Sequence, residues 1–223
     1  MDKKILLGLT TTRNSDWRTK VKEINEYNIR DIALFLTGLE KKEREELYRL
    51  LAHTNINSIY HVHLRGDMDE KEISYLIDTY DVQAFNIHSI RSNYPFDNLA
   101  EKFYKKTYIE NTFVVPTKNE LLKYGGLCVD FSHWESYKWT HLYEYYKLKN
   151  LADHFNIGCC HVSAIRYLGG IVADDQHIAS DKKDFDYLKK YIKYLPNHIS
   201  LELENSFKDQ LEYKKYIQQQ ILI

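Results

Sequence analysis

Short apolar runs rich in β-branched residues alternate along the chain with longer amphipathic stretches, and this pattern predicts strands that alternate with helices. The eight predicted strands are Lys4–Thr10, Ile32–Thr37, Ser58–Leu64, Gln83–His88, Thr107–Asn111, Leu127–Phe131, Gly158–Ser163 and Ile199–Glu204. Helices are predicted at Asp16–Tyr27, Lys41–His53, Asp69–Tyr80, Asp97–Lys105, Glu135–Phe155, Phe185–Leu195 and Lys208–Gln219. A further helix begins near Thr117, which fits a capping box with Glu120, and stops at Gly125-Gly126.

Strands that are each followed by a helix or a long loop predict a parallel sheet, and eight such units predict a closed (β/α)₈ TIM barrel rather than an open doubly wound sheet. With 223 residues the chain is near the lower limit for this fold, so we expect a single compact domain over residues 1–223 with trimmed loops. The sequence has no GxGxxG or GxxxxGK[ST] motif after a predicted strand, which argues against dinucleotide or P-loop chemistry.

Composition narrows the class of protein further. The 31 Lys and Arg residues nearly balance the 32 Asp and Glu residues, whereas proteins that bind nucleic acids extensively usually carry a basic excess. No apolar run approaches the roughly 18 residues that a membrane span needs. The three cysteines, two of them adjacent, cannot build a disulfide framework. We therefore expect a cytoplasmic protein that has no membrane segment.

Polar side chains gather at the ends of the predicted strands, and in a TIM barrel the carboxyl ends of the strands carry the chemistry. Strand-side parity allows these side chains to point into the barrel mouth while their apolar neighbours face the helices. The set comprises His61, His63, His88, Glu110, Asp130, His133, His161, Asp175, His177, Glu202 and Glu204.

Imidazole and carboxylate groups that converge in one mouth predict a divalent-metal site, because together they suit zinc, manganese or iron. Glu110 could bridge two ions in such a site. A single histidine at a strand end is more often a hydrogen-bonded structural residue, and we prefer this interpretation for His61. The whole set is harder to explain without metal, because each buried unpaired acid or imidazole would cost several kcal/mol.

The segments VHLRG, FNIHS, YIENT, VDFSHW, CHVS, DDQH and LELEN, in this order, resemble the metal-binding motifs of the endonuclease IV and xylose-isomerase-like barrel superfamily. The resemblance implies one of two ligand patterns. In the sugar isomerase and epimerase branch, one ion is held by Glu110, Asp130, His161 and Glu204, with His133 as a substrate contact.

In the endonuclease IV branch, the resemblance implies three zinc ions. The first is held by His63, His88 and Glu110, the second by Glu110, Asp130, His161 and Glu204, and the third by His133, Asp175 and His177. The Asp-x-His pair after the seventh strand favours this branch, because a one-ion isomerase does not need it. The spacing cannot choose between Glu202 and Glu204, and we prefer Glu204 because it directly precedes the Asn205-Ser206 turn.

The leading hypothesis is therefore a metal-dependent phosphoesterase with up to three zinc ions, in which Glu110 or Glu204 orients the attacking water. Arg65 and Arg166 follow predicted strands and are candidate phosphate contacts. Because the intervals between ligands are short, we expect a small phosphorylated, nucleotide or sugar substrate, not extensive binding of duplex DNA.

Two alternatives belong to other classes of protein. A sugar or sugar phosphate isomerase or epimerase would use one manganese or similar ion, and Glu110 and Glu204 would move a proton between carbons of the substrate. A barrel without catalytic activity could instead bind a ligand or a partner.

Overall fold

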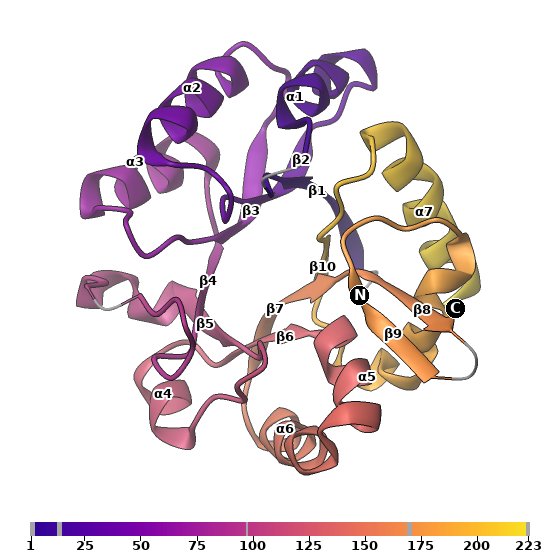
Figure 1. Cartoon of the computed structure of the whole chain (residues 1–223). Coiled ribbons are helices and arrows are strands. Elements are labelled where there is room, and N and C mark those ends of the chain that lie inside the picture. The colour runs from indigo at the N-terminus through magenta and orange to yellow at the C-terminus, as the bar shows by residue number, and fades with distance from the viewer. Residues whose placement is uncertain (1–2, 13–14, 97, 169–170, 222–223) are drawn as a thin grey trace.

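The structure is a computed structural model that describes residues 3–12, 15–96, 98–168 and 171–221. Eight parallel strands close into a barrel in the order β1-β10-β7-β6-β5-β4-β3-β2, with helices around its outside (Figure 1). The barrel strands are β1 (Lys4–Thr10), β2 (Asp31–Phe35), β3 (Ser58–His63), β4 (Ala84–His88), β5 (Thr107–Glu110), β6 (Leu127–Asp130), β7 (Ile157–Val162) and β10 (His198–Leu201). The chain is thus an α/β protein with the TIM-barrel architecture that the strand and helix alternation predicts.

The outer helices begin where the sequence offers a capping side chain. Asp16, Asp69 and Thr117 each accept a hydrogen bond from a backbone N–H in the first turn of their helix, and Thr117 forms the predicted capping box with Glu120. The helices are α1 (Trp17–Glu26), α2 (Lys41–Leu51), α3 (Glu70–Tyr80), α4 (Lys118–Lys123), α5 (Phe131–Thr140), α6 (Leu142–His154) and α7 (Phe207–Gln220). Within the described ranges, none of the helices is long and apolar enough to cross a membrane.

The barrel interior changes from apolar to polar along its axis. Two small buried clusters, one of Leu6, Ala33 and Phe35 and one of Ala84, Cys128 and Cys159, fill part of it. Nearer the carboxyl ends the inward positions are ionisable, and the register pairs His88 with Glu110 and Asp130 with His161. Strand register therefore sets histidines and carboxylates at matching heights in the mouth.

A glycine in β7 keeps this register. The pairing of β6 with β7 shifts between Leu127 and Cys128, so that Gly158 is an extra residue in β7. A Cβ atom on Gly158 would lie 2.0 Å from the ring of Tyr108 on β5. Only glycine lets that ring lie against the β7 backbone, upstream of His161.

Three predicted helices differ from the structure. The predicted helix Glu135–Phe155 is two helices, α5 and α6, with a break at His141 (φ −145°, ψ 64°). The predicted helix Phe185–Leu195 consists of the 3₁₀ segments η2 (Lys182–Lys190) and η3 (Ile192–Tyr194). In η2 the buried Phe185 and Leu188 are three residues apart, a spacing that suits a 3₁₀ helix. The short predicted helix at Asp97–Lys105 is η1 (Glu101–Lys106), and Asp97 lies outside the described residues.

A β-hairpin follows β7 where the sequence analysis expects a loop. It pairs β8 (Ala164–Leu168) antiparallel with β9 (Ile171–Gln176), and Figure 1 shows it as a two-arrow arm outside the barrel sheet. The missed signal is the Gly169-Gly170 dipeptide between two strand-like runs, which is typical of a hairpin turn.

A buried arginine connects α2 to α3. Arg44 is fully buried and donates to Glu72 (2.7 and 3.0 Å), to Asp67 (3.1 Å) and to the Leu39 carbonyl (3.0 Å). We expect Arg44→Met to lower the free energy of unfolding by about 3 kcal/mol, because Glu72 is left nearly buried without its counter-charge.

Urea denaturation followed by circular dichroism measures this effect. The matched control is Arg18→Met, which removes a bidentate Arg–Glu pair to Glu46 at the exposed surface and should cost far less than Arg44→Met. Equal losses in the two variants would contradict the structural role given to Arg44.

Candidate metal centre

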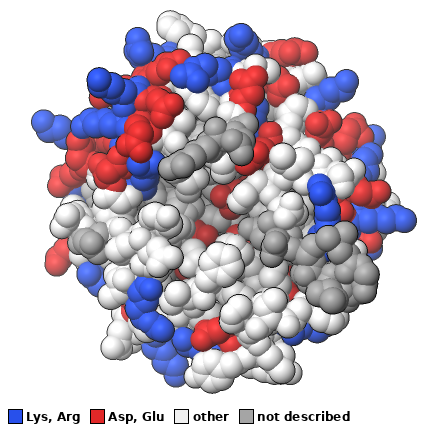
Figure 2. Space-filling model, in the orientation of Figure 1, with Lys and Arg blue, Asp and Glu red and all other residues white. Residues whose placement is uncertain are grey.

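A cavity opens at the carboxyl ends of the barrel strands. It has a volume of about 310 Å³, and Figure 2 shows acidic atoms at the bottom of a central depression on this face. The cavity is lined by Thr37, His63, His88, Ser92, Asn93, Tyr94, Glu110, Thr112, Phe113, Val114, His133, His177 and Glu202. Four of the predicted histidines and the predicted Glu110 thus share one cavity wall.

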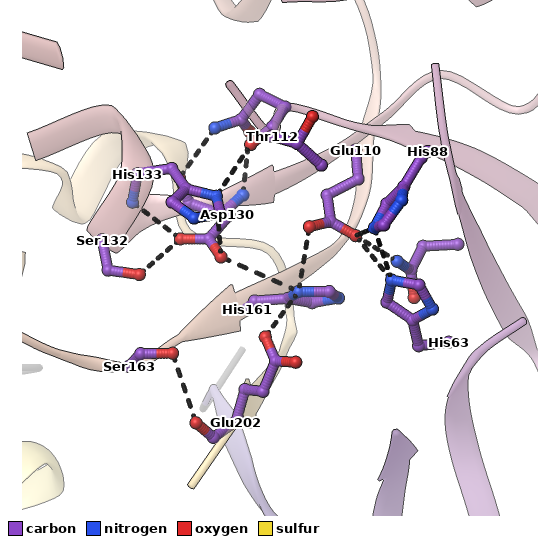
Figure 3. A network of polar contacts seen from close by, with 12 residues as sticks. His63, His88, Glu110, Thr112, Asp130, Ser132, His133, His161, Ser163 and Glu202 are labelled. Carbon is purple, nitrogen blue, oxygen red and sulfur yellow. Dashed lines mark hydrogen bonds and ion pairs between the residues drawn. The ribbon is translucent and has the colours of Figure 1, made fainter. Parts of the chain in front are cut away.

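Glu110, at the end of β5, lies between two groups of imidazoles (Figure 3). On one side its Oε2 atom is 3.0 Å from Nε2 of His63 and 3.8 Å from Nε2 of His88. The Nε2 atoms of these two histidines are 3.1 Å apart. The Nδ1 atom of His63 lies 2.9 Å from the Leu64 carbonyl, a contact that holds the ring with its Nε2 atom toward the cavity.

On its other side Glu110 faces His161 of β7. Oε1 of Glu110 is 3.7 Å from Nδ1 of His161, which is also 3.9 Å from Oδ2 of Asp130 and 3.0 Å from Oε2 of Glu202. One carboxylate, Glu110, therefore serves both groups with a different oxygen for each. Ligand atoms of Asp130, His161 and Glu202 lie within 4.8 Å of one another, as do those of His63, His88 and Glu110.

His161 provides the test of whether a cation fits here. Its side chain is fully buried, and among the described residues neither ring nitrogen has a hydrogen-bond partner of acceptable geometry. Burial disfavours the charged ring, but the carboxylates of Glu110 and Glu202 outweigh it and raise the pKa of His161 to about 10. A buried imidazole with open nitrogens beside several carboxylates is the donor set that a divalent ion completes.

The carboxylates of this cluster are held in their ionised form. Burial favours the neutral form of Glu110, but the facing imidazoles, His161 foremost, hold its pKa well below the usual range. Burial likewise opposes the charge of Glu202, and His161 and His177 lower its pKa. Burial lowers the pKa of His88, which favours the neutral ring that a metal requires.

A third group lies at the start of α5. Oδ2 of Asp130 is 3.4 Å from Nδ1 of His133, and its Oδ1 atom caps α5 by accepting from the His133 N–H at 2.9 Å. His177 lines the same cavity, with Nδ1 3.2 Å from the Glu202 carbonyl. The side chain of Asp175 lies outside the described part of the structure. Two of the three side chains predicted for a third ion thus share the cavity.

Glu204 is not in the cavity, and this corrects the preference drawn from the sequence. The Thr12 hydroxyl donates to the Glu204 carboxylate, whereas the Glu202 carboxylate contacts His161 and lines the cavity. In β10, Ser200 pairs with His161, so that Glu202 comes one inward position later and Glu204 one position beyond the mouth. Glu202 therefore replaces Glu204 in the candidate ligand set.

The two predicted phosphate contacts have other partners. Arg65 donates to the Thr37 carbonyl at 3.1 Å and pairs with Glu40 and Asp67. Arg166 donates to the Ile178 carbonyl at 2.7 Å. Neither side chain lines the cavity, so the structure does not bring them to the candidate site.

Behind Glu110 lies a series of hydrogen-bonded side chains that includes Asn86, a residue not predicted from the sequence. The amide of Asn86 donates to Oε2 of Glu110 at 2.6 Å, and its Oδ1 atom is 2.9 Å from Nε2 of His61. His61 in turn lies 2.8 Å from the Ser200 hydroxyl, and one of its ring nitrogens also lies within 4.8 Å of ligand atoms of Cys128 and His161. Asn86 could have been found, because it precedes His88 by two residues and so faces the same side of β4.

The fold and the cluster define a TIM barrel whose mouth carries several groups of His, Glu and Asp side chains able to hold metal ions. No protein-family model matches the chain, and no curated protein matches it. The geometry of the mouth is therefore the basis for the function inferred below.

The two neighbouring glutamates give a matched test of the ligand set. We expect Glu202→Gln to weaken zinc binding at least tenfold, because it removes a charged donor beside His161. The Glu204 carboxylate is hydrogen-bonded to Thr12, so the Glu204→Gln variant should bind zinc as tightly as the original protein. Competition against a chromophoric chelator measures both affinities, and a reversed order would return Glu204 to the ligand set.

Metal binding should also depend on pH. Because the pKa of His161 is raised to about 10, its ring is protonated at neutral pH in the metal-free protein, and an ion must displace that proton. The apparent zinc affinity should therefore rise about tenfold for each pH unit between pH 6 and 8 from this group alone. Titration calorimetry in buffers of different ionisation enthalpy counts the released protons, and an affinity independent of pH would refute the protonated state.

Proposed function

We propose that the chain is a divalent-metal-dependent phosphoesterase, similar in its ligand pattern to the endonuclease IV branch of the barrel superfamily. One observation carries the proposal. Glu110 presents one oxygen to His63 and His88 and the other to His161. A one-ion enzyme would have no use for the first pair, whereas a bridging carboxylate between two ion sites is the arrangement used for displacement at phosphorus.

The proposed ligands follow the groups of side chains at the barrel mouth. A first ion would be held by His63, His88 and Glu110, and a second by Glu110, Asp130, His161 and Glu202. His133 and His177 would contribute to a third, with Asp175 added on the strength of the resemblance alone. These residues would hold ions that, when bound, would supply Lewis-acid chemistry to a phosphoryl oxygen and to water.

The protein's own residues position and charge this site. Asn86 fixes the orientation of Glu110 through a hydrogen bond of 2.6 Å, and the capping contact to α5 fixes that of Asp130. The low pKa of Glu110 makes this carboxylate a weak proton acceptor. We therefore assign Glu110 to ion binding and to orienting water.

Cavity size limits the substrate. A volume of about 310 Å³ is at the low end of the roughly 300–1,000 Å³ of small-molecule sites. The described lining has no Lys or Arg, so a phosphate would be held by the bound ions and by uncharged donors. These features support a small phosphate ester as substrate and count against duplex DNA.

The same lack of basic side chains in the described lining favours a second candidate, a sugar isomerase or epimerase that acts on an uncharged polyol. In that enzyme a single ion would bind near His161, and Glu110 and Glu202 would flank the substrate carbon. The number of bound ions separates the two candidates.

Elemental analysis of protein purified without added metal tests the proposal. We expect two to three zinc ions per chain in the original protein and about one fewer in His63→Ala. The original protein should hydrolyse a generic phosphodiester, and His177→Ala should abolish this activity. The matched control is His154→Ala, an exposed histidine of α6 that bonds to the Asn150 carbonyl and should change neither readout.

Other outcomes would replace the proposal. About one ion per chain, with turnover of a sugar and none of a phosphodiester, supports the isomerase. A protein whose melting temperature responds to neither chelator nor added zinc or manganese supports the barrel without catalytic activity.

A further inference from the structure

Two aromatic side chains stand exposed at the mouth of the metal cavity. Tyr94, in the segment after β4, is 78% exposed, and Phe113, after β5, is 80% exposed. Both line the same cavity as His63, His88 and Glu110. The ring of Phe113 lies 5.5 Å from that of His133 at an interplanar angle of 42°, so this aromatic side chain adjoins a candidate ligand.

Single exposed aromatic residues are common on protein surfaces and need no explanation. A pair that lines one small cavity directly beside a cluster of ionisable groups is different, because aromatic walls with a few polar groups are typical of ligand sites. Folding does not account for their position, since four-fifths of each side chain is in solvent. A ligand in the cavity can therefore contact either ring.

We propose that Tyr94 and Phe113 form a stacking subsite for a planar ring, and that the substrate is a nucleoside phosphate whose phosphate lies at the metal cluster. This inference rests on the phosphoesterase function proposed above and names its substrate class. Stacking on exposed aromatic side chains binds any base through its π-face. The described lining has no Lys or Arg, so these walls recognise the organic part of the substrate by its ring and not by charge.

The rest of the wall suits a nucleoside. Ser92, Asn93 and Thr112 line the cavity beside the two rings. An amide such as that of Asn93 offers donors and an acceptor to the edge of a base. A cavity of about 310 Å³ has room for one nucleotide but not for the flanking nucleotides of a longer strand.

Binding of two matched probes to the zinc-loaded protein tests the subsite. Adenosine 5′-monophosphate and ribose 5-phosphate share the sugar and the phosphate, and only the first carries a base. By calorimetry we expect the first to bind at least about fivefold more tightly. Tyr94→Ala and Phe113→Ala should each reduce this ratio, whereas Tyr94→Phe, which keeps the ring, should retain it.

A control variant excludes a general effect of removing surface tyrosines. Tyr143 of α6 is 77% exposed but does not line the cavity, so Tyr143→Ala should leave the ratio unchanged. Zinc content, measured for each variant, shows that the neighbouring ligands are intact. A loss of the ratio in Tyr143→Ala equal to that in Tyr94→Ala would overturn the subsite.

The outcomes separate this inference from the proposed function. Equal affinity for the two probes, with phosphodiester hydrolysis intact, overturns the stacking subsite and leaves the phosphoesterase standing. Binding of adenosine and of ribose, which both lack phosphate, tests the subsite independently of the phosphoesterase function. A preference for adenosine that is lost in Tyr94→Ala supports the subsite whether or not a phosphoester is hydrolysed. Absence of phosphoester hydrolysis would overturn the phosphoesterase function alone.

Discussion

The contact of buried His161 with surrounding carboxylates is the interaction on which the rest of the mouth depends. Its ring is completely buried, lies 3.0 Å from Glu202 and faces Glu110 of β5 and Asp130 of β6. Charges removed from water in this way are stable only when a counter-charge is fixed beside them. A proton on His161 supplies it in the metal-free protein, because its pKa is about 10, and a divalent ion would supply it more fully.

Strand register and the layer beneath the cluster hold this arrangement in place. The chain of contacts from Ser200 through His61 and Asn86 to Glu110 crosses the barrel interior from β10 to β5. Each member restrains the next, so that the Glu110 carboxylate keeps one oxygen for each neighbouring group. Preorganisation of this kind lets ligands bind an ion without a further loss of side-chain freedom.

Parity explains how much of the site could be predicted from the sequence. Alternation along a strand identifies the inward residue, and for this reason His63, His88, Glu110, Asp130 and His161 converge as predicted. Glu202 and Glu204 have the same parity, so parity cannot decide which of them is the candidate ligand. That decision depends on how far along the barrel axis each residue lies, which is set by the pairing of Ser200 of β10 with His161 of β7. The break at His141 and the pairing of β8 with β9 likewise leave no mark in the spacing of apolar residues.

In the proposed function, charge at the mouth would couple metal binding to the choice of substrate. Although the 31 basic residues nearly balance the 32 acidic ones overall, the described cavity lining has carboxylates and no Lys or Arg. Basic side chains near it are committed elsewhere, as Arg65 is to Glu40 and Asp67. A phosphate would be repelled by Glu110 and Glu202 until ions reverse the local field, whereas a ring on Tyr94 and Phe113 would be attracted in either state. In the proposed enzyme, metal loading would therefore decide whether the anionic part of a substrate can bind, and the aromatic rim would decide which organic group it can carry.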